Sequence, residues 1–174
     1  MRVYLRALEI SDVDNLIKWR NDLEVTSSLG GNTFFVSSLR ETEWIKNATL
    51  NDDKNIRLAI CLNENDKYIG NVNLTSINWI NRSAEFSIMI GDKSQWGKGL
   101  GKEATFLILK YAFEEVNLNR IYLTVRNDNE KAKGLYKNVG FTQEGTLRKS
   151  IFKNNKYIDM VVMSILKDEF NGRI

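Results

Sequence analysis

The segment 85–104, EFSIMIGDKSQWGKGLGKEA, constrains the fold of this chain more than any other stretch. It opens with the apolar run 86–90, which predicts a buried strand. A glycine-spaced loop at 97–101 then leads into a helix, because apolar residues recur at helical spacing from Ala104 to Ala112. The N–H groups at a helix start have no partner within the helix, and glycine lets an anion approach them closely. The segment therefore predicts a binding site for a phosphate group.

The spacing of the loop glycines narrows the kind of phosphate ligand. Both the GxxxxGK[ST] loop and the GxGxxG fingerprint need a glycine where this chain has Lys102. The order x-Gly-x-Gly-x-Gly after a strand instead resembles the pyrophosphate loop of the GNAT superfamily of acetyl-CoA-dependent N-acetyltransferases. In its usual form, Gln/Arg-x-x-Gly-x-Gly/Ala, Trp96 occupies the Gln/Arg position, and Gly99 and Gly101 occupy the glycine positions. An ordinary tight turn between strand and helix is the alternative for this loop alone.

Tryptophan at position 96 departs from the superfamily pattern, but it resembles the branch that acetylates the N-termini of ribosomal proteins. The run Trp19-Arg20-Asn21-Asp22 is similar to the same branch. Its alternative interpretation is a tryptophan packed on a sheet and an arginine in a surface ion pair. The segment 77–86 also resembles bacterial spermidine acetyltransferases.

A second signature lies in the segment 126–141. Asn129 follows a predicted strand and stands seven residues before Tyr136, as in the superfamily, and Gly-Phe closes the segment. Asn129 also fits the N-cap of a short helix, and Gly140 fits its C-cap. Taken alone, Tyr136 on a short helix is better explained as a core residue. The two signatures occur in the family's order along one chain, and this supports the resemblance.

The resemblance implies roles for a set of residues. Backbone groups around Ile88, Met89 and Ile90 would bind the pantetheine arm of acetyl-CoA where two central strands part. The pyrophosphate would be held by Trp96, Gly97, Lys98, Gly99, Leu100, Gly101 and Lys102, and Asn129 would bind the cofactor with its amide. Tyr136 would be the acid at the sulfur, since a phenol is protonated at neutral pH. Glu85 is our candidate base, acting through water; a carboxylate pairing across the sheet is its alternative.

Composition limits the chemistry that is available. The chain has no histidine and one cysteine, Cys61, which lies in an apolar run and fits a buried thiol. Histidine triads and histidine metal sites are therefore excluded, so a base must be a carboxylate, tyrosine, lysine or water chain. We expect no metal. The net charge of +3 is dispersed, which does not favour nucleic acid as a partner. No membrane span and no signal-like N-terminus are seen, so a cytoplasmic location is expected.

The pattern predicts one α/β (α+β) domain over residues 1–174. Strands are expected at 3–8, 56–62, 68–77, 86–90, 121–125, 146–152 and 157–166. Helices are expected after the cap pair Ser11 and Asp14, after Ser38, from the glycine loop to 116–119, and between Asn129 and Gly140. The expected fold is the GNAT fold, a twisted and mostly antiparallel mixed sheet of about seven strands with four helices on both faces.

The acceptor is less constrained than the donor. We favour the N-terminal amine of a protein or a small primary amine, with spermidine or another polyamine as the alternative and an amino sugar as a further one. Glu24, Glu41 and Glu43 are candidate carboxylates for a cationic acceptor, although simple solvation is the alternative for each. From another class, a noncatalytic acyl-CoA-binding protein stays open, but it has no need of an acid such as Tyr136. A homo-oligomer is also possible.

Overall fold

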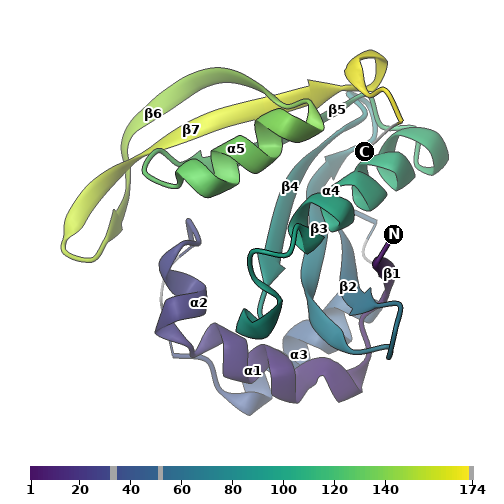
Figure 1. Ribbon diagram of the computed structural model, residues 1–174, viewed down its shortest axis with the longest axis vertical. Coiled ribbons are helices and arrows are strands. Elements are labelled where there is room, and N and C mark those ends of the chain that lie inside the picture. The colour runs from purple at the N-terminus through teal and green to yellow at the C-terminus, as the bar shows by residue number, and fades with distance from the viewer. Residues whose placement is uncertain (32–34, 51–52, 173–174) are drawn as a thin grey trace.

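The computed structural model describes residues 1–31, 35–50 and 53–172, which form a seven-stranded sheet with helices on both faces (Figure 1). The strands are β1 (Val3–Ala7), β2 (Ile56–Leu62), β3 (Tyr68–Asn78), β4 (Ser83–Ile90), β5 (Arg120–Arg126), β6 (Thr142–Lys153) and β7 (Lys156–Leu166). They lie in the order β1-β2-β3-β4-β5-β7-β6, and every described pairing is antiparallel except that of β4 with β5. The predicted mixed, mostly antiparallel sheet is confirmed.

The described residues contain five α-helices: α1 (Val13–Arg20), α2 (Leu23–Ser27), α3 (Ser38–Thr49), α4 (Leu100–Lys110) and α5 (Glu130–Val139). The one that we did not predict is the short α2, which Asp22 caps by accepting from the N–H groups of Glu24 and Val25. A π-helical turn, Tyr111–Glu115, extends α4 toward its predicted end. The π-turn and α2 are the main differences from the predicted helices.

Two of the predicted caps were wrong. Ser11 does not cap α1; a 3-10 turn precedes the helix, and Asp12 Oδ2 accepts from the N–H of Glu9 at 2.9 Å. The cap of α3 is Ser37 rather than Ser38, since its Oγ accepts from the N–H of Arg40 at 3.2 Å. The predicted caps of α5 are confirmed, with Asn129 at its start and Gly140 at its end.

Apolar residues on the two faces of the sheet form separate cores. On one face α4 and α5 pack on residues such as Phe86 and Ile121, and on the other face α1 and α3 pack on residues such as Ala59 and Tyr68 (Figure 1). Cys61 is a free, fully buried thiol in the second core, as predicted. Within the part of the chain that the structure describes, no helix combines the length and apolarity needed to cross a membrane.

The sheet divides between β4 and β5. These parallel strands pair only at their first residues, Ser83 with Arg120, Ala84 with Ile121 and Glu85 with Tyr122. β4 continues to Ile90 and β5 continues to Arg126, but β4 does not pair with β5 beyond Glu85. The parting of the central strands, which the family resemblance implied, is therefore present, and it leaves the second half of β4 open on one side.

Candidate functional site

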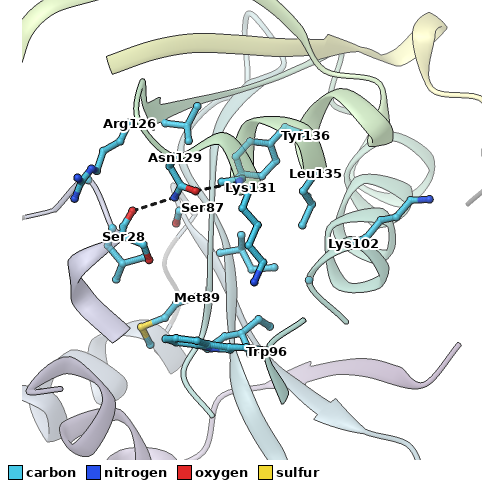
Figure 2. A pocket seen from close by; sticks show the side chains of 18 of the residues that line it. Ser28, Ser87, Met89, Trp96, Lys102, Arg126, Asn129, Lys131, Leu135 and Tyr136 are labelled. Atoms are coloured by element: carbon cyan, nitrogen blue, oxygen red, sulfur yellow. Dashed lines mark hydrogen bonds between the residues drawn. The ribbon is translucent and has the colours of Figure 1, made fainter. Parts of the chain in front are cut away.

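A cavity of about 800 Å³ lies where β4 and β5 part. Its walls come from β4, the glycine loop, the start of α4, the end of β5, α5 and the segment after α2 (Figure 2). The predicted site residues that line it are Ile88, Met89, Ile90, Trp96, Gly97, Gly99, Leu100, Gly101, Lys102, Asn129 and Tyr136. Two predicted site residues, Glu85 and Lys98, do not belong to this lining.

The glycine loop reaches α4 through two left-handed residues. Gly97 has φ +77° and Gly99 has φ +80°, a region that side-chain-bearing residues rarely adopt. Gly99 is the N-cap of α4, so Leu100 and Gly101 stand in the first turn, whose N–H groups have no partner within the helix. Because both residues line the cavity, the loop offers it a helix start suited to a phosphate group.

Trp96 fastens this loop to the end of β4. Its indole Nε1 donates to the backbone carbonyl of Ile90 at 2.8 Å. The ring also packs against the core below α1 and α3 while lining the cavity. A tryptophan at the position where the superfamily usually has Gln or Arg thus acts here as a strut between the loop and the strand.

Three lysines surround the loop, and they lie differently. Lys98 is exposed, and its ammonium donates to Gln95 Oε1 at 3.1 Å outside the cavity lining. Lys102 lines the cavity at its backbone end, but its side chain extends away along α4 (Figure 2). Lys131, which the sequence analysis missed, points from α5 into the cavity (Figure 2). Lys131 is therefore better placed than Lys98 to meet an anionic ligand there.

Tyr136 lies on α5 with its ring against the open half of β4. The ring meets Phe86 edge-on, with centroids 5.9 Å apart and planes at 85°. Burial raises the pKa of Tyr136 to about 12, so the phenol keeps its proton at neutral pH. The structure thus combines a protonated hydroxyl group with a place on the cavity wall, as an acid at a leaving group requires.

Both polar atoms of the Asn129 side-chain amide form hydrogen bonds with the protein backbone. Its Oδ1 accepts from the N–H of Ala132 at 3.1 Å, which caps α5. Its Nδ2 donates to the carbonyl of Ser28 at 3.4 Å, drawn as a dashed line in Figure 2. A contact of this amide with a cofactor would have to replace or share the weaker of these bonds.

A second cavity of about 330 Å³ opens on the α1 and α3 side of the sheet. It shares Leu29, Gly30, Ser87, Ile88 and Met89 with the first cavity, so the two meet at the middle of β4. The ionisable side chains in its lining, as far as the structure describes the chain, are Arg20 and Arg40. The remaining polar side chains of the lining are neutral, with Asn71 and Asn73 among them.

The carboxylates predicted to face a cationic acceptor lie in different places. Glu41 is fully buried beside the second cavity, paired with Arg20 at 2.9 Å, and burial raises the pKa of its carboxyl group. Glu24 lines the first cavity but binds Lys93 at 2.8 Å, and Glu43 is exposed on α3. The structure therefore does not bring the three carboxylates together into one binding site for a cationic acceptor.

Trp19 and Arg20 are neighbours in sequence but have different surroundings, since Trp19 packs in the core and Arg20 lines the second cavity. Trp19 is 6% exposed and sits on Gly91, where an added Cβ would lie 2.0 Å from the indole. Arg20 spans the buried Glu41 and the ring of Trp44, whose centroid is 5.9 Å from the guanidinium carbon. The packed tryptophan of the alternative interpretation is present, but the ion pair of Arg20 is not at the surface, because Glu41 is fully buried, and Arg20 also lines the second cavity.

Glu85 lies just outside both cavities. It is half-buried in β4 opposite Thr75 and Tyr122, where its charge adds to burial in raising the pKa of Tyr122. Alternation along the strand puts Glu85 on the same face as Ser87, a residue of both linings. Two strand residues span roughly 7 Å, so a proton relay from Glu85 to the cavity at Ser87 needs a short chain of water molecules.

The first cavity fits an acyl-CoA molecule in its chemistry. It has an apolar wall at Ile88, Ile90 and Leu135, an open strand edge on β4, and a helix start with a lysine beside it. These features suit a pantetheine arm and a diphosphate. The described residues contain no cluster of His, Cys, Asp and Glu side chains that is able to hold a metal ion.

Comparisons with known proteins identify the family of this chain. Residues 2–142 match the family model of the acetyltransferase (GNAT) domain. The chain is 35% identical to the spermidine N(1)-acetyltransferase of Vibrio cholerae serotype O1 over 97% of this chain and 95% of that protein. The crystal structure of spermidine N-acetyltransferase from Vibrio cholerae in complex with CoA and spermine matches with a TM-score of 0.89 at 33% identity, over 97% of each chain.

A shorter match joins the chain to the other predicted branch. It is 34% identical to the putative ribosomal N-acetyltransferase YdaF of Bacillus subtilis over 59% of this chain and 56% of that protein. The loop, the parted strands and the family match lead to one conclusion: this chain belongs to the GNAT family and is an acetyl-CoA-dependent N-acetyltransferase.

Proposed function

We propose that this enzyme acetylates a primary amine of a polyamine such as spermidine. The observation that carries the proposal is the similarity along nearly the whole chain to spermidine acetyltransferases, at 35% identity in sequence and a TM-score of 0.89 in structure. The sequence resemblance favours a protein N-terminal amine as the acceptor, whereas these relatives support the polyamine alternative better.

In this proposal the two cavities have different tasks. The first holds acetyl-CoA, which supplies the activated acetyl group, and the second admits the amine. Leu100 and Gly101 donate backbone N–H groups to the pyrophosphate, with Lys131 beside them. Because the linings share Ser87, Ile88 and Met89, the open half of β4 is where amine and acetyl group meet.

Proton handling then falls to two side chains on opposite sides of β4. Glu85 takes the proton of the amine through water, since no histidine is present and the carboxylate shares a strand face with Ser87. Tyr136 supplies a proton to the sulfur of the leaving group, because its pKa of about 12 keeps the phenol protonated. Backbone N–H groups on the open edge of β4 stabilise the developing oxyanion.

A peptide N-terminus is the second candidate acceptor, and the charges of the second cavity favour it. Arg20 and Arg40 line this cavity, whereas a polyamine is best bound by carboxylates. Guanidinium groups donate to carbonyl and carboxylate oxygens, which a peptide carries beside its amine. The match to the putative ribosomal N-acetyltransferase YdaF points in the same direction.

An acceptor panel at saturating acetyl-CoA tests the proposal. Thiol release would be measured with spermidine, spermine, a short peptide with a free N-terminus, glucosamine and no acceptor. We expect spermidine to give the highest kcat/KM. A preference for the peptide would establish the second candidate, and acetyl-CoA binding without amine-dependent thiol release would show a noncatalytic acyl-CoA-binding protein.

Arg40→Gln sharpens the same panel because it changes the charge of the second cavity with little change in volume. For spermidine we expect a lower KM, since one repelling cation is removed. For a peptide we expect a higher KM, since a donor to its oxygens is lost. An equal effect on both acceptors would mean that the charge of Arg40 does not act on the bound amine.

A further inference from the structure

The segment 26–31 separates the two cavities, and we call it the partition segment. Leu29 and Gly30 belong to both linings, Ser27 and Ser28 line the first cavity, and Thr26 and Gly31 line the second. Its position therefore sets the shape of the passage through which an amine approaches the open half of β4.

Lys153 holds this segment from the far end of the sheet. It is the last residue of β6, its exposed fraction is 5%, and its ammonium reaches across 120 or more positions of sequence. The Nζ atom donates to the carbonyls of Thr26 and Leu29 at 2.6 Å each and of Gly31 at 3.3 Å. An ammonium has three protons, so the partition segment satisfies all of its donors.

Two further side chains complete the attachment. Arg126, at the end of β5, donates to the carbonyl of Ser27, and Asn129 donates to that of Ser28. Backbone contact is close as well, because an added Cβ at Gly30 would lie 2.8 Å from Met160 Cε on β7. The partition segment comes from the N-terminal part of the chain. Its four partners all come from the part that follows the division between β4 and β5; they are Lys153, Arg126, Asn129 and Met160.

We propose that Lys153 is a positioning residue for the amine acceptor: through its three carbonyl contacts it fixes the partition segment and so shapes the second cavity. The inference rests on the proposed N-acetyl transfer, but not on the identity of the amine. It assigns to the β6–β7 hairpin a part in acceptor binding, although Lys153 belongs to neither cavity lining.

The effect falls on the acceptor more than on the donor. Each cavity takes four residues from the partition segment, but these are four of the 13 residues that line the second cavity and only four of the 29 that line the first. The glycine loop and the start of α4, to which we assign the pyrophosphate, belong to the first cavity and lie outside the second lining. Loss of Lys153 would therefore leave the main donor site in place.

The test compares Lys153→Met with Lys156→Met. Methionine keeps a long apolar side chain but donates no hydrogen bond, and Lys156 is an exposed lysine on the same hairpin turn. With spermidine and with the peptide, we expect Lys153→Met to raise the acceptor KM about tenfold, which corresponds to about 1.4 kcal/mol. The Kd for acetyl-CoA should change less than about twofold, a range within ordinary scatter for independent sites. Lys156→Met should match the wild type.

Hydrogen exchange gives a second measurement that needs no turnover. Amides in the peptide covering 23–31 should exchange faster in Lys153→Met than in Lys156→Met, while those of α4 stay unchanged. Unchanged exchange at 23–31, or an acceptor KM equal in the two variants, would overturn the proposal. Failure of every amine in the panel would refute the proposed function instead, and the exchange measurement would still decide the role of Lys153.

A double variant guards against a general loss of stability. Lys153 and Arg126 hold the same segment, so their effects on acceptor KM should be less than additive when Lys153→Met is combined with Arg126→Met. Fully additive effects, with a rise in the Kd for acetyl-CoA in Lys153→Met alone, would mean that Lys153 only stabilises the fold, and would overturn the proposal; the single variant is the one to compare because Arg126 lines the first cavity.

Discussion

Tyr136 is both a core residue and the candidate catalytic acid. Its ring belongs to the core, since it packs on Phe86 and Phe141 at centroid distances of 5.9 and 5.7 Å. Its residue also lines the donor cavity, and burial raises its pKa to about 12. The packing interpretation is confirmed and is compatible with the proposed catalytic role, because the core contacts fix the ring and burial keeps the proton on the hydroxyl group.

Tyr136→Phe separates these two contributions, since phenylalanine keeps the ring and removes only the proton donor. We expect kcat to fall roughly tenfold to a thousandfold, which overlaps the contribution of about a hundredfold to ten-thousandfold that a positioned acid or base typically makes. The Kd for acetyl-CoA, measured by calorimetry, should stay close to the wild-type value. If binding falls as much as turnover, the tyrosine is structural and does not act as the acid.

Glu85→Gln tests the proposed base with a nearly isosteric change. Glutamine has nearly the same size as glutamate and can still form hydrogen bonds, but it cannot take a proton. The kcat/KM for the amine should therefore fall roughly tenfold to a hundredfold. Glu64→Gln, in the exposed loop between β2 and β3, is the matched control. A pH profile of kcat/KM identical in the Glu85 variant and the wild type would assign the proton to another group.

At this scale the sequence predicted residue types better than contacts. The spacing from Asn129 to Tyr136 and the glycines at 97–101 indicated, from local order alone, residues that line one cavity in the structure. Arg40 and Lys153 were missed because nothing in their neighbourhood along the chain marks them, and Lys131 was missed, although it lies within the segment 126–141, because the sequence does not show where its side chain points. Each gains its role from a surface far away in sequence, such as the carbonyls that lie 122 to 127 positions before Lys153.

Among the elements, the glycine loop is the one whose backbone matters most to function. Gly99 has φ +80° at the N-cap of α4, so a β-branched residue there must either strain or rotate the first turn of the helix. Either change moves the N–H groups of Leu100 and Gly101 from the place where the pyrophosphate is proposed to bind. Gly97 has the same left-handed backbone but open space around it.

Gly99→Val should therefore weaken or abolish binding of acetyl-CoA. A strain of about 1–3 kcal/mol placed on the bound loop corresponds to roughly tenfold to a hundredfold in Kd. Gly145→Val on β6 is the control, since an added Cβ there meets nothing within 4 Å and its φ is not positive. An unchanged Kd in Gly99→Val would remove the loop from the donor site.

The elements were largely predictable, and the exceptions have local causes. Strands such as β2 and β5 carry clear apolar patterns, and the turn between β6 and β7 lies at the predicted residues, with Asn154 and Asn155 at positive φ. The helix α2 was missed because five residues give too short a pattern, and a side-chain cap from Asp22 stabilises it. Ser11 was chosen as a cap by type, but Asp12 does the local bonding through its longer reach.

At the scale of the whole molecule, two halves meet at a short seam. Three residue pairs join β4 to β5, and the contacts of Lys153, Arg126 and Asn129 with the partition segment join the halves again beyond the donor cavity. The order of strands was predictable from the family resemblance. The second attachment was not, because it depends on hydrogen bonds to backbone carbonyls, which leave no pattern in a single sequence.

The strands β5, β6 and β7 are connected by an ion pair and a hydrogen bond of Glu144, and this gives a prediction for stability in acid. Glu144 on β6 accepts from Arg120 on β5 at 2.7 and 2.6 Å and from Ser164 on β7 at 2.7 Å, so one carboxylate connects three strands. These bonds lower the pKa of Glu144 to about 2 from an ordinary value of 4.5. A lowered folded-state pKa means that the link stabilises the folded state above pH 4.5 and is lost as the pH falls toward 2.

Glu144→Gln should lower the free energy of unfolding at pH 7 by about 1 kcal/mol or less, because the pair is partly exposed and water screens it. Near pH 2 the wild-type carboxylate is about half protonated and most of its contribution to stability is lost, so the two urea midpoints should lie much closer together there than at pH 7. Glu114→Gln, which breaks an exposed pair with Lys110 at 3.9 Å, is the control and should change neither midpoint measurably. The same difference between Glu144→Gln and wild type at both pH values would mean that the loss comes from shape or packing, not from the charge that joins the three strands.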